Sequence, residues 1–440
     1  MNELEKKGTS EDKEKVLKAW KSWRIRIFLT VWVTYMIYYL GRVNIGIAKP
    51  FMMAEFGIEP AAFGLIGTAL FIMYAIGQFV NGQLGDKYGA RRIVAIGLII
   101  SSFINLLIGF STGILWVLIF LWGINGYFQS MGWAPSVKTI ANWYPPEQRG
   151  QKSSRLATSY LTGGAVSWIL ATFIITTLGL DWRFSFWVPG IIMLFLGVHF
   201  YVRARNAPEE VGLPTIEEEC AGIIEMGKCR EDTHLGFKYT ITTIVKNRTV
   251  LFAAFGLFCL NIVRYGITEW LPYILVSEVI SGDFFPLWKT IAFPIGGIFG
   301  ALFCTWFSDK FLGRRRVPII CTLFFLLTIS LFVYALIPPL NWVIGAPLLI
   351  LIGFFTFAPH VLLVATIPME FGTRKAASSA TGFIDGWGYI GSAITTFFSG
   401  VLIGDTGPEA AFLFWIITAL AGGLVLIAAW NSLPEKKEYL

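Results

Sequence analysis

Twelve apolar runs dominate this 440-residue chain, six on each side of a polar segment. Each is near the roughly 20 residues that a helix needs to cross a bilayer. Charged residues make up only 14% of the chain, whereas soluble domains carry about 25%. The pattern predicts an all-α membrane protein with twelve transmembrane helices in two pseudo-symmetric six-helix bundles. The predicted spans are 25–48, 61–84, 92–110, 114–137, 156–178, 183–203, 250–276, 286–307, 317–338, 344–367, 377–402 and 410–431.

Basic residues are distributed unevenly over the loops between these runs. If every span crosses the membrane, most lysines and arginines fall on the side that holds both termini, and the opposite loops hold little beyond Lys49, Arg183 and Lys289. Cytoplasmic loops are enriched in such residues. We therefore expect a multi-pass protein of the cell membrane with both termini cytoplasmic. The net charge of +7 then reflects topology and not nucleic-acid binding.

The predicted units are a charged cytosolic segment (1–24), an N-terminal bundle (25–203), a linker (204–248), a C-terminal bundle (249–432) and a tail (433–440). The first segment has no apolar core of a signal peptide, so we expect it to be retained. Leu17, Trp20 and Trp23 fit either a short interfacial helix or a solvated tail with a few anchors.

Neither a metal site nor an enzyme active site is apparent in the sequence. Cys220, Cys229 and His234 come nearest to a zinc site, but a fourth ligand is missing. The soluble segments contain no nucleotide-binding glycine loop and no paired nucleophile and base. We expect no cofactor and no catalysis.

An internal repeat relates the two halves. Arg42 and Arg264 lie 222 residues apart, whereas Asp86 and Asp309, like Glu147 and Glu370, lie 223 apart. Parallel repeats of this kind are typical of secondary carriers that bind substrate near the midplane, between the repeats.

Arg42 and Arg264 each lie inside an apolar run. A guanidinium in hydrocarbon costs at least about 2.5–3.5 kcal/mol, so one is retained mainly where it pairs or binds a ligand. The two arginines therefore predict a carrier that holds an anion between its halves.

Aspartates followed by basic residues occur at corresponding turns, in GQLGDKYGARR (82–92) and in TWFSDKFLGRRR (305–316). These charged turns have two possible roles. They form a charge latch that closes the cytoplasmic face in one state, or their basic residues only set the topology. We favour the latch because the pattern recurs in both halves. The predicted gating or coupling residues are Asp86, Arg91, Glu147, Arg149, Glu269, Asp309, Arg314, Glu370, Arg374 and Asp385.

Four segments are distinctive: MGWAPSVKTIANWYPPEQRG (131–150), GFFTFAPHVLLVATIPMEFGTRKAASSATGF (353–383), GWGYIGS (386–392) and the linker RNAPEEVGLPTIEE (205–218). Through them nearly the whole chain, about 25–432, resembles the major facilitator superfamily, and within it the organophosphate:phosphate antiporters that take up glycerol 3-phosphate or hexose phosphates.

The resemblance implies that Arg42, after Tyr38 and Tyr39, and Arg264 grip the phosphoryl oxygens. Bidentate, charge-assisted hydrogen bonds suit a planar guanidinium better than an ammonium. It also implies that Trp133 and Tyr389 belong to the pocket and that Glu269 occupies an acidic position of span 7.

Three positions depart from the family's glycerol-phosphate members. Tyr160 stands where they have a histidine, Gln78 where they have a lysine, and Pro294 where they have a glutamate. We expect the pocket to bind a less negative or differently shaped anion. His360 follows Pro359, and a kink there would turn it toward the cavity; a hydrogen bond to a neighbouring helix is an equal alternative. Asp385 fits a partner for an arginine, a proton carrier, or a locally paired helix-packing residue.

The sequence therefore predicts a monomeric carrier that exchanges a small phosphorylated metabolite for inorganic phosphate by alternating access. A proton-coupled symporter of sugar acids or other organic carboxylates is the first alternative. Its family has a similar Arg-x-Asn motif but usually an acidic residue where this chain has Gly41. A transporter-like sensor is the second alternative.

Overall fold

The computed structural model describes residues 10–214, 248–277, 285–311, 317–337, 342–366 and 377–430, and within these ranges the regular structure is entirely helical. The N-terminal half contains α1 (Ser10–Tyr38), η1 (Tyr39–Gly41), α2 (Asn44–Phe56), α3 (Pro60–Tyr88), α4 (Ala90–Gly109), α5 (Leu115–Gln129), α6 (Trp133–Trp143), α7 (Pro146–Thr172), η2 (Phe173–Thr177), α8 (Phe184–Arg203) and η3 (Pro208–Val211). The C-terminal half contains α11 (Arg248–Ser277), η4 (Phe285–Ile291), α12 (Ala292–Phe311), α13 (Val317–Ala335), α14 (Trp342–Val361), η5 (Leu362–Thr366), α16 (Ala377–Asp405) and α17 (Pro408–Ile427).

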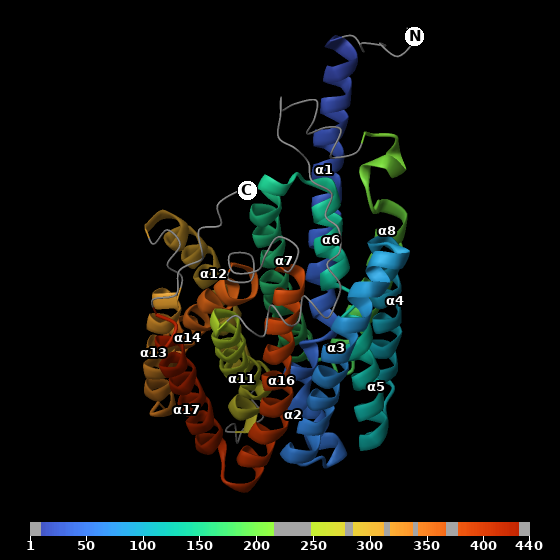
Figure 1. Ribbon diagram of the computed structural model, residues 1–440. Coiled ribbons are helices and arrows are strands. Elements are labelled where there is room, and N and C mark those ends of the chain that lie inside the picture. Colours follow the sequence, from blue (N-terminus) through green and yellow to red (C-terminus); the bar gives the residue numbers. More distant parts are fainter. Residues whose placement is uncertain are drawn as a thin grey trace, which may run out of the picture.

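The two halves stand side by side, and α1 begins on the same side of the bundle as α17 ends (Figure 1). Inside the N-terminal half α3 packs on α5 and α4 on α8, and the C-terminal half repeats this arrangement with α12 on α14 and α13 on α17. Between the halves, α3 packs on α16, α7 on α12 and α2 on α11. The sequence repeat is thus a repeat of helix packing, and its interface is the place where a ligand would be held between the halves.

Ten helices among the described residues are long and apolar enough to cross a membrane. The two other predicted spans are interrupted. Span 25–48 falls on α1, η1 and α2, and span 114–137 falls on α5 and α6. Broken helices occur at membrane depth where they are buried in protein or line a cavity, so both interruptions point to the interior of the bundle.

Glycines allow close approach at equivalent places in the two halves. A Cβ at Gly126 of α5 would overlap the carbonyl oxygen of Leu70 on α3, and one at Gly353 of α14 would overlap that of Phe293 on α12. Close packing through small residues is the usual way in which helices associate in lipid, where the hydrophobic effect does not drive them together.

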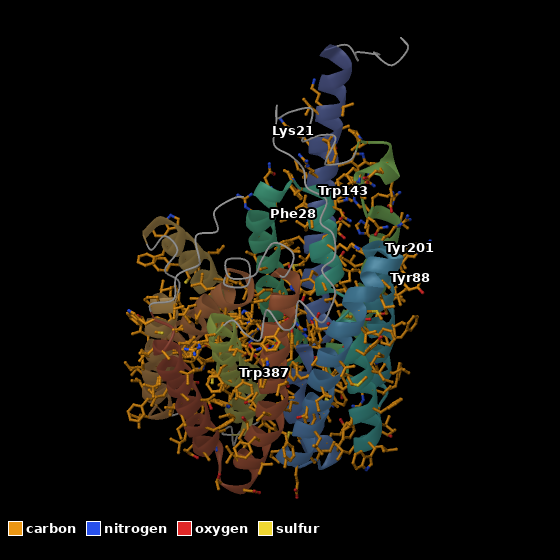
Figure 2. The ribbon with its side chains drawn as sticks, in the orientation of Figure 1. Lys21, Phe28, Tyr88, Trp143, Tyr201 and Trp387 are labelled. Atoms are coloured by element: carbon orange, nitrogen blue, oxygen red, sulfur yellow. The ribbon has the colours of Figure 1, made fainter. Side chains whose placement is uncertain are left out.

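The segment predicted as cytosolic is, from Ser10 onward, a continuous part of α1, which protrudes from the bundle. Trp20 is only 1% exposed. Its ring meets Trp143 edge-on at 5.8 Å between centroids, and Trp23 stacks on the same ring at 6.1 Å. Trp143 lies where α1 leaves the bundle (Figure 2). These two tryptophans therefore anchor α1 to the C-terminal end of α6. Residues 1–9 lie outside the described ranges.

At the end of the bundle opposite the start of α1, a cluster of charged residues holds α2 against the start of α8. Arg183 donates hydrogen bonds to Glu55 at 2.5 and 3.0 Å and to Asp181 at 3.2 Å. Trp182 Nε1 also donates to Glu55, at 2.7 Å. Hydrogen bonds from Arg183 and Trp182 lower the pKa of Glu55 below its ordinary value of 4.5.

We expect Glu55→Gln to lower the thermal stability of the purified protein only modestly at pH 7, because partly exposed ion pairs contribute about 1 kcal/mol or less. Since the folded-state pKa is depressed, the contribution is present above pH 4.5 and is lost as the pH falls through the folded-state pKa. The melting temperatures of wild type and variant, measured in detergent from pH 7 downward, should therefore converge. A difference that stays constant would assign the effect to packing.

Candidate functional site

The interruption of the first span positions Arg42. Where η1 replaces the α-helix, backbone carbonyls lose their regular partners and need others in a membrane interior. Asn105 Nδ2 and Asn125 Nδ2 both donate to the carbonyl oxygen of Gly41, at 3.1 and 2.9 Å. Asn44 Nδ2 donates to Asn105 Oδ1 at 3.1 Å. This buried amide network fixes the break directly before Arg42, so the guanidinium leaves the chain at a defined point.

The side chain of Arg42 is buried, with 2% exposure. Its guanidinium carbon lies 4.0 Å from the ring centroid of Tyr39 and 5.0 Å from that of Tyr74. Ring faces stabilise a cation without consuming its N–H donors. Arg42 Nε and Nη2 have no hydrogen-bond partner among the described residues. Because an unpaired buried donor is costly, these two N–H groups are available to an acceptor that the described residues do not supply.

Arg264, from α11 in the other half, is also buried and lies over aromatic rings, 4.8 Å from Tyr265 and 5.6 Å from Tyr160. Arg264 Nη1 donates to His360 Nε2 at 2.8 Å. Arginine can only donate, so Nε2 is unprotonated and the proton lies on Nδ1. That nitrogen is 3.1 Å from Tyr160 Oη and donates to it. His360 therefore bonds to a neighbouring helix and, at the same time, reaches across to the N-terminal half.

A cavity lies at this contact between the halves, with about 430 Å³ of empty space when the part open to solvent is included. Each half contributes six lining residues, and Arg264 is the charged residue among them. Tyr160 and Pro294, two of the three departures from the family pattern, are both in the lining. The full set is Tyr39, Val43, Tyr160, Leu161, Gly164, Trp168, Arg264, Tyr265, Thr268, Phe293, Pro294 and Phe357.

Tyrosines connect the surroundings of the two arginines. Tyr74, beneath Arg42, packs on Tyr389 at 4.4 Å between centroids, and Tyr389 lies 6.3 Å from Tyr265. The hydroxyl of Tyr265 is buried without a hydrogen-bond partner among the described residues, and Tyr265 is within electrostatic range of both guanidinium groups. The half-buried Asp385 of α16 also interacts electrostatically with both arginines. Side chains that can donate hydrogen bonds to an anion thus surround a common region between the two halves.

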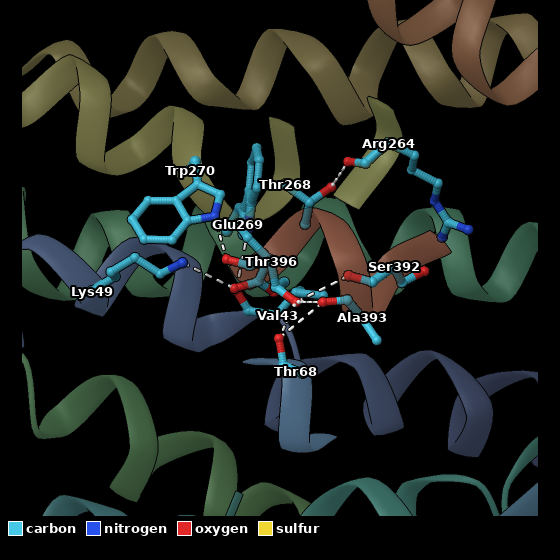
Figure 3. Close-up of polar contacts among 11 residues, drawn as sticks. Val43, Lys49, Thr68, Arg264, Thr268, Glu269, Trp270, Ser392, Ala393 and Thr396 are labelled. Carbon is cyan, nitrogen blue, oxygen red and sulfur yellow. Dashed lines mark hydrogen bonds and ion pairs between the residues drawn. The ribbon is translucent and has the colours of Figure 1, made fainter. Parts of the chain in front are cut away.

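Glu269 makes a contact that the sequence did not reveal. Its Oε2 lies 3.2 Å from Lys49 Nζ, and both side chains are buried, at 6% and 2% exposure. Lys49 Nζ also lies 3.9 Å from the ring centroid of Trp270. Lys49 belongs to α2 and Glu269 to α11, so this buried ion pair joins the halves (Figure 3).

The pair lies beyond the arginines, toward the end of the bundle opposite the start of α1, called the far end below. Further contacts close the halves there. Thr68 Oγ1 of α3 donates to the carbonyl oxygen of Ala393 on α16 at 2.9 Å and lies 3.1 Å from Thr396 Oγ1 (Figure 3). A Cβ at Gly64 would overlap the Thr396 carbonyl oxygen. The structure therefore represents a state whose far end is closed.

Other predicted binding residues are placed less directly. Tyr38 donates its hydroxyl proton to the carbonyl oxygen of Val94 at 2.6 Å, inside the N-terminal half and away from the cavity. Trp133 lies 6.4 Å from Tyr160 in an edge-on contact, next to the lining. Gln78 is partly buried, and its Nε2 has no partner among the described residues. Like Arg42, His360 and Tyr389, these three residues are not in the cavity lining, and their part in binding stays a prediction.

The predicted cytoplasmic latch remains a prediction. Arg91 Nε donates to the Tyr201 carbonyl oxygen at 2.5 Å, a contact within the N-terminal half. Asp86, Glu147, Arg149 and Asp309 lie on described helices, but their side chains are outside the description, and Arg314, Glu370 and Arg374 lie outside the described residues. So do Cys220, Cys229 and His234; elsewhere, the described residues contain no cluster of three metal-ligating side chains.

We expect His360→Gln to retain more activity than His360→Leu. A glutamine can accept from Arg264 through its carbonyl oxygen and donate to Tyr160 through its amide, whereas leucine leaves both partners unpaired. Loss of a hydrogen bond to a charged group costs about 1.5–3 kcal/mol, so anion uptake by His360→Leu should fall by roughly 10-fold or more. Initial rates in proteoliposomes check this. Equal activity of the two variants would mean that only the volume of the side chain matters.

Two repeated helical halves with a cavity between them, lined by an arginine and three tyrosines beside apolar side chains, are the arrangement typical of secondary carriers. The chain belongs to the Major Facilitator Superfamily, whose family model matches residues 31–396. This membership confirms the predicted twelve-span, two-bundle fold and the prediction that the chain is not an enzyme.

Three relatives match almost the whole chain. A protein named as a probable hexose phosphate transport protein from Chlamydia trachomatis is 32% identical, covering 96% of this chain and 94% of that protein. A glycerol-3-phosphate transporter from Bacillus subtilis is 29% identical, over 96% and 95%. The membrane sensor protein UhpC of Escherichia coli is 30% identical, again over 96% and 95%. They confirm the predicted resemblance to organophosphate transporters.

Among solved structures, a bacterial homologue of the human lysosomal transporter Spinster, in an inward-facing and occupied conformation, superposes with a TM-score of 0.69. It is 14% identical and covers 93% of this chain and 95% of that one. At this identity the likeness concerns the fold alone.

Proposed function

We propose that this protein exchanges a small phosphorylated metabolite for inorganic phosphate across the plasma membrane, as a monomer, by alternating access. The observation that carries the proposal is Arg42, buried and charged, with two N–H donors that no described residue satisfies. Arg264 faces the cavity from the other half. A phosphoryl group has several acceptor oxygens in a fixed arrangement and can accept from both guanidinium groups at once. Glycerol 3-phosphate, phosphoglycerate and sugar phosphates are the candidate substrates.

Exchange follows from the position of the two arginines on opposite halves. Without an anion their charges repel each other, and a bound phosphoryl group that bridges them favours closure of the halves around it. A tenfold preference for the bridged state requires only about 1.4 kcal/mol of differential binding. Closure that depends on occupancy makes the return of the empty carrier slow, so net transport requires a counter-substrate.

The direction of access follows if both termini are cytoplasmic, as the basic loops predict. The far end is then extracellular, and its contacts, including Lys49–Glu269 and Thr68–Ala393, close the extracellular side. Opening that side requires these contacts to break. The latch residues at the other end would form the equivalent closure in the alternate state.

The proton-coupled symporter remains a second candidate because of Asp385. Gly41 leaves no carboxylate directly before Arg42, but Asp385 interacts with both arginines and offers a protonatable group at the site. The sensor alternative is supported by the 30% identity to a membrane sensor protein. Measured flux distinguishes a carrier from a protein that only senses.

The experiment is uptake of radiolabelled phosphate into proteoliposomes loaded with phosphate, with and without a pH gradient. Self-exchange without the gradient supports the proposal, and export of loaded glycerol 3-phosphate or sugar phosphate against external phosphate extends it. Gradient-driven uptake that gluconate-like acids inhibit, without phosphate exchange, would establish the symporter. If the protein binds phosphate but shows no flux under any condition, the sensor alternative is supported.

A further inference from the structure

The cavity between the halves has a polar end and an apolar end. Tyr39, Tyr160 and Tyr265 lie beside Arg264 and supply hydroxyl groups at that end. The rest of the wall is formed mainly by aliphatic and aromatic surfaces, contributed by Val43, Leu161, Trp168, Phe293, Pro294 and Phe357.

The polar atoms in this second part of the wall are already satisfied. Trp168 Nε1 donates to the carbonyl oxygen of Val43 at 3.2 Å, and Thr268 Oγ1 donates to the carbonyl oxygen of Arg264 at 2.7 Å. Pro294 has no N–H group. A ligand that extends away from Arg264 therefore meets carbon surfaces and few free donors or acceptors.

Two aromatic contacts show that this wall is continuous across the halves. Trp168 of the N-terminal half lies 6.5 Å from Phe293 of the C-terminal half, and Phe293 lies 5.5 Å from Phe357. Phe357 also lies 4.9 Å below the guanidinium of Arg264. The apolar surface thus begins directly beside the anion-binding end.

We propose that the site selects phosphate monoesters whose organic part carries few or no hydroxyl groups, and that Trp168, Phe293, Pro294 and Phe357 determine this preference. The inference rests on the proposed binding of a phosphoryl group by the arginines. The phosphoryl group occupies the donors at the polar end. Each hydroxyl placed against the apolar wall loses its water without gaining a partner, which weakens binding by about tenfold per unpaired group.

Matched pairs of ligands test the preference. n-Propyl phosphate and glycerol 3-phosphate have the same carbon chain, with no hydroxyl group and with two. (Tetrahydropyran-2-yl)methyl phosphate and glucose 6-phosphate have the same ring, with no hydroxyl group and with four. Each competes with radiolabelled phosphate in phosphate-loaded proteoliposomes. We expect the hydroxyl-free member of each pair to inhibit at a concentration at least tenfold lower. Equal or reversed potency within both pairs would overturn the proposal.

Two variants locate the effect on the wall. Phe357→Tyr adds one hydroxyl inside the cavity. It should reduce at least threefold the ratio between the inhibitory concentrations of glucose 6-phosphate and its hydroxyl-free partner. Phe354→Tyr makes the same change one turn earlier, beside Phe303 and away from the lining, and should leave the ratio unchanged. Equal ratios in wild type and Phe357→Tyr would contradict the role of the wall. If Phe357→Tyr does not fold, Pro294→Ser in the first turn of α12 serves the same test.

The design separates this inference from the proposed function. Phosphate self-exchange by the wild type tests the function without reference to the organic part of any substrate. If self-exchange is absent, the proposed function fails and the wall has no phosphate ester to select. If self-exchange is present and the polyol phosphates compete best, the function holds and the inference is wrong.

Discussion

Replacing either arginine of the pair by lysine should reduce phosphate exchange by about 10- to 100-fold, although the charge is kept. Lysine offers a compact ammonium, whereas arginine presents a planar fork of donors that matches two phosphoryl oxygens. Each charge-assisted hydrogen bond that is lost costs about 1.5–3 kcal/mol. Arg42→Lys is the sharper of the two variants, because Arg42 Nε and Nη2 are the buried donors without described partners, whereas Arg264 also holds His360.

The measurement is the initial rate of phosphate self-exchange over a range of phosphate concentrations. Arg155→Lys is the matched control. Arg155 is exposed on α7, so this variant makes the same chemical change outside the cavity. It should exchange phosphate like the wild type. Near-normal exchange by Arg42→Lys would exclude bidentate binding at this position and return the substrate class to an open question.

The architecture could be predicted from the sequence because lipid imposes strong rules. Apolar runs of the right length specify spans, and a shared offset specifies repeated halves. The arginines were found by the same reasoning, since a charge in an apolar run is conspicuous. His360 was recognised too, but the sequence left open whether it faces the cavity or a neighbouring helix, and the structure shows bonds to Arg264 and, across the halves, to Tyr160.

The features that the sequence did not specify have local causes. Tyr38 and Tyr39 look equivalent in sequence, but neighbouring helical residues point about 100° apart, and only Tyr39 lines the cavity. Lys49 was interpreted as a loop charge because the first span was drawn to residue 48; the helix breaks at η1 and continues through α2 to Phe56. Tyr74 and Tyr265 carry no sequence signal among so many aromatic residues. No sequence pattern pairs Lys49 with a carboxylate 220 residues away.

The buried pair of Lys49 and Glu269 should behave unlike an ordinary surface ion pair when it is broken. Removing one partner leaves the other charge buried and uncompensated, which costs about 3–5 kcal/mol, whereas an apolar replacement of both is often nearly neutral. We therefore expect Lys49→Met and Glu269→Gln each to reduce exchange by roughly 100-fold or more. The double variant should recover much of this loss, because it leaves no unpaired charge.

The double variant should recover exchange activity but should still differ from the wild type in conformation, because the pair joins α2 of one half to α11 of the other. Opening the far end must separate these groups, so a double variant without them should populate the open far end more than wild type does. Accessibility of a cysteine placed at Thr68, measured with a membrane-impermeant thiol reagent, reports this population. Glu55→Gln is the matched control, because Glu55 pairs with Arg183 inside one half, and it should change neither exchange nor accessibility. If the double variant is as inactive as the single variants and its far end stays closed, the pair is not a gate between the halves, and Glu269 must act on the substrate itself.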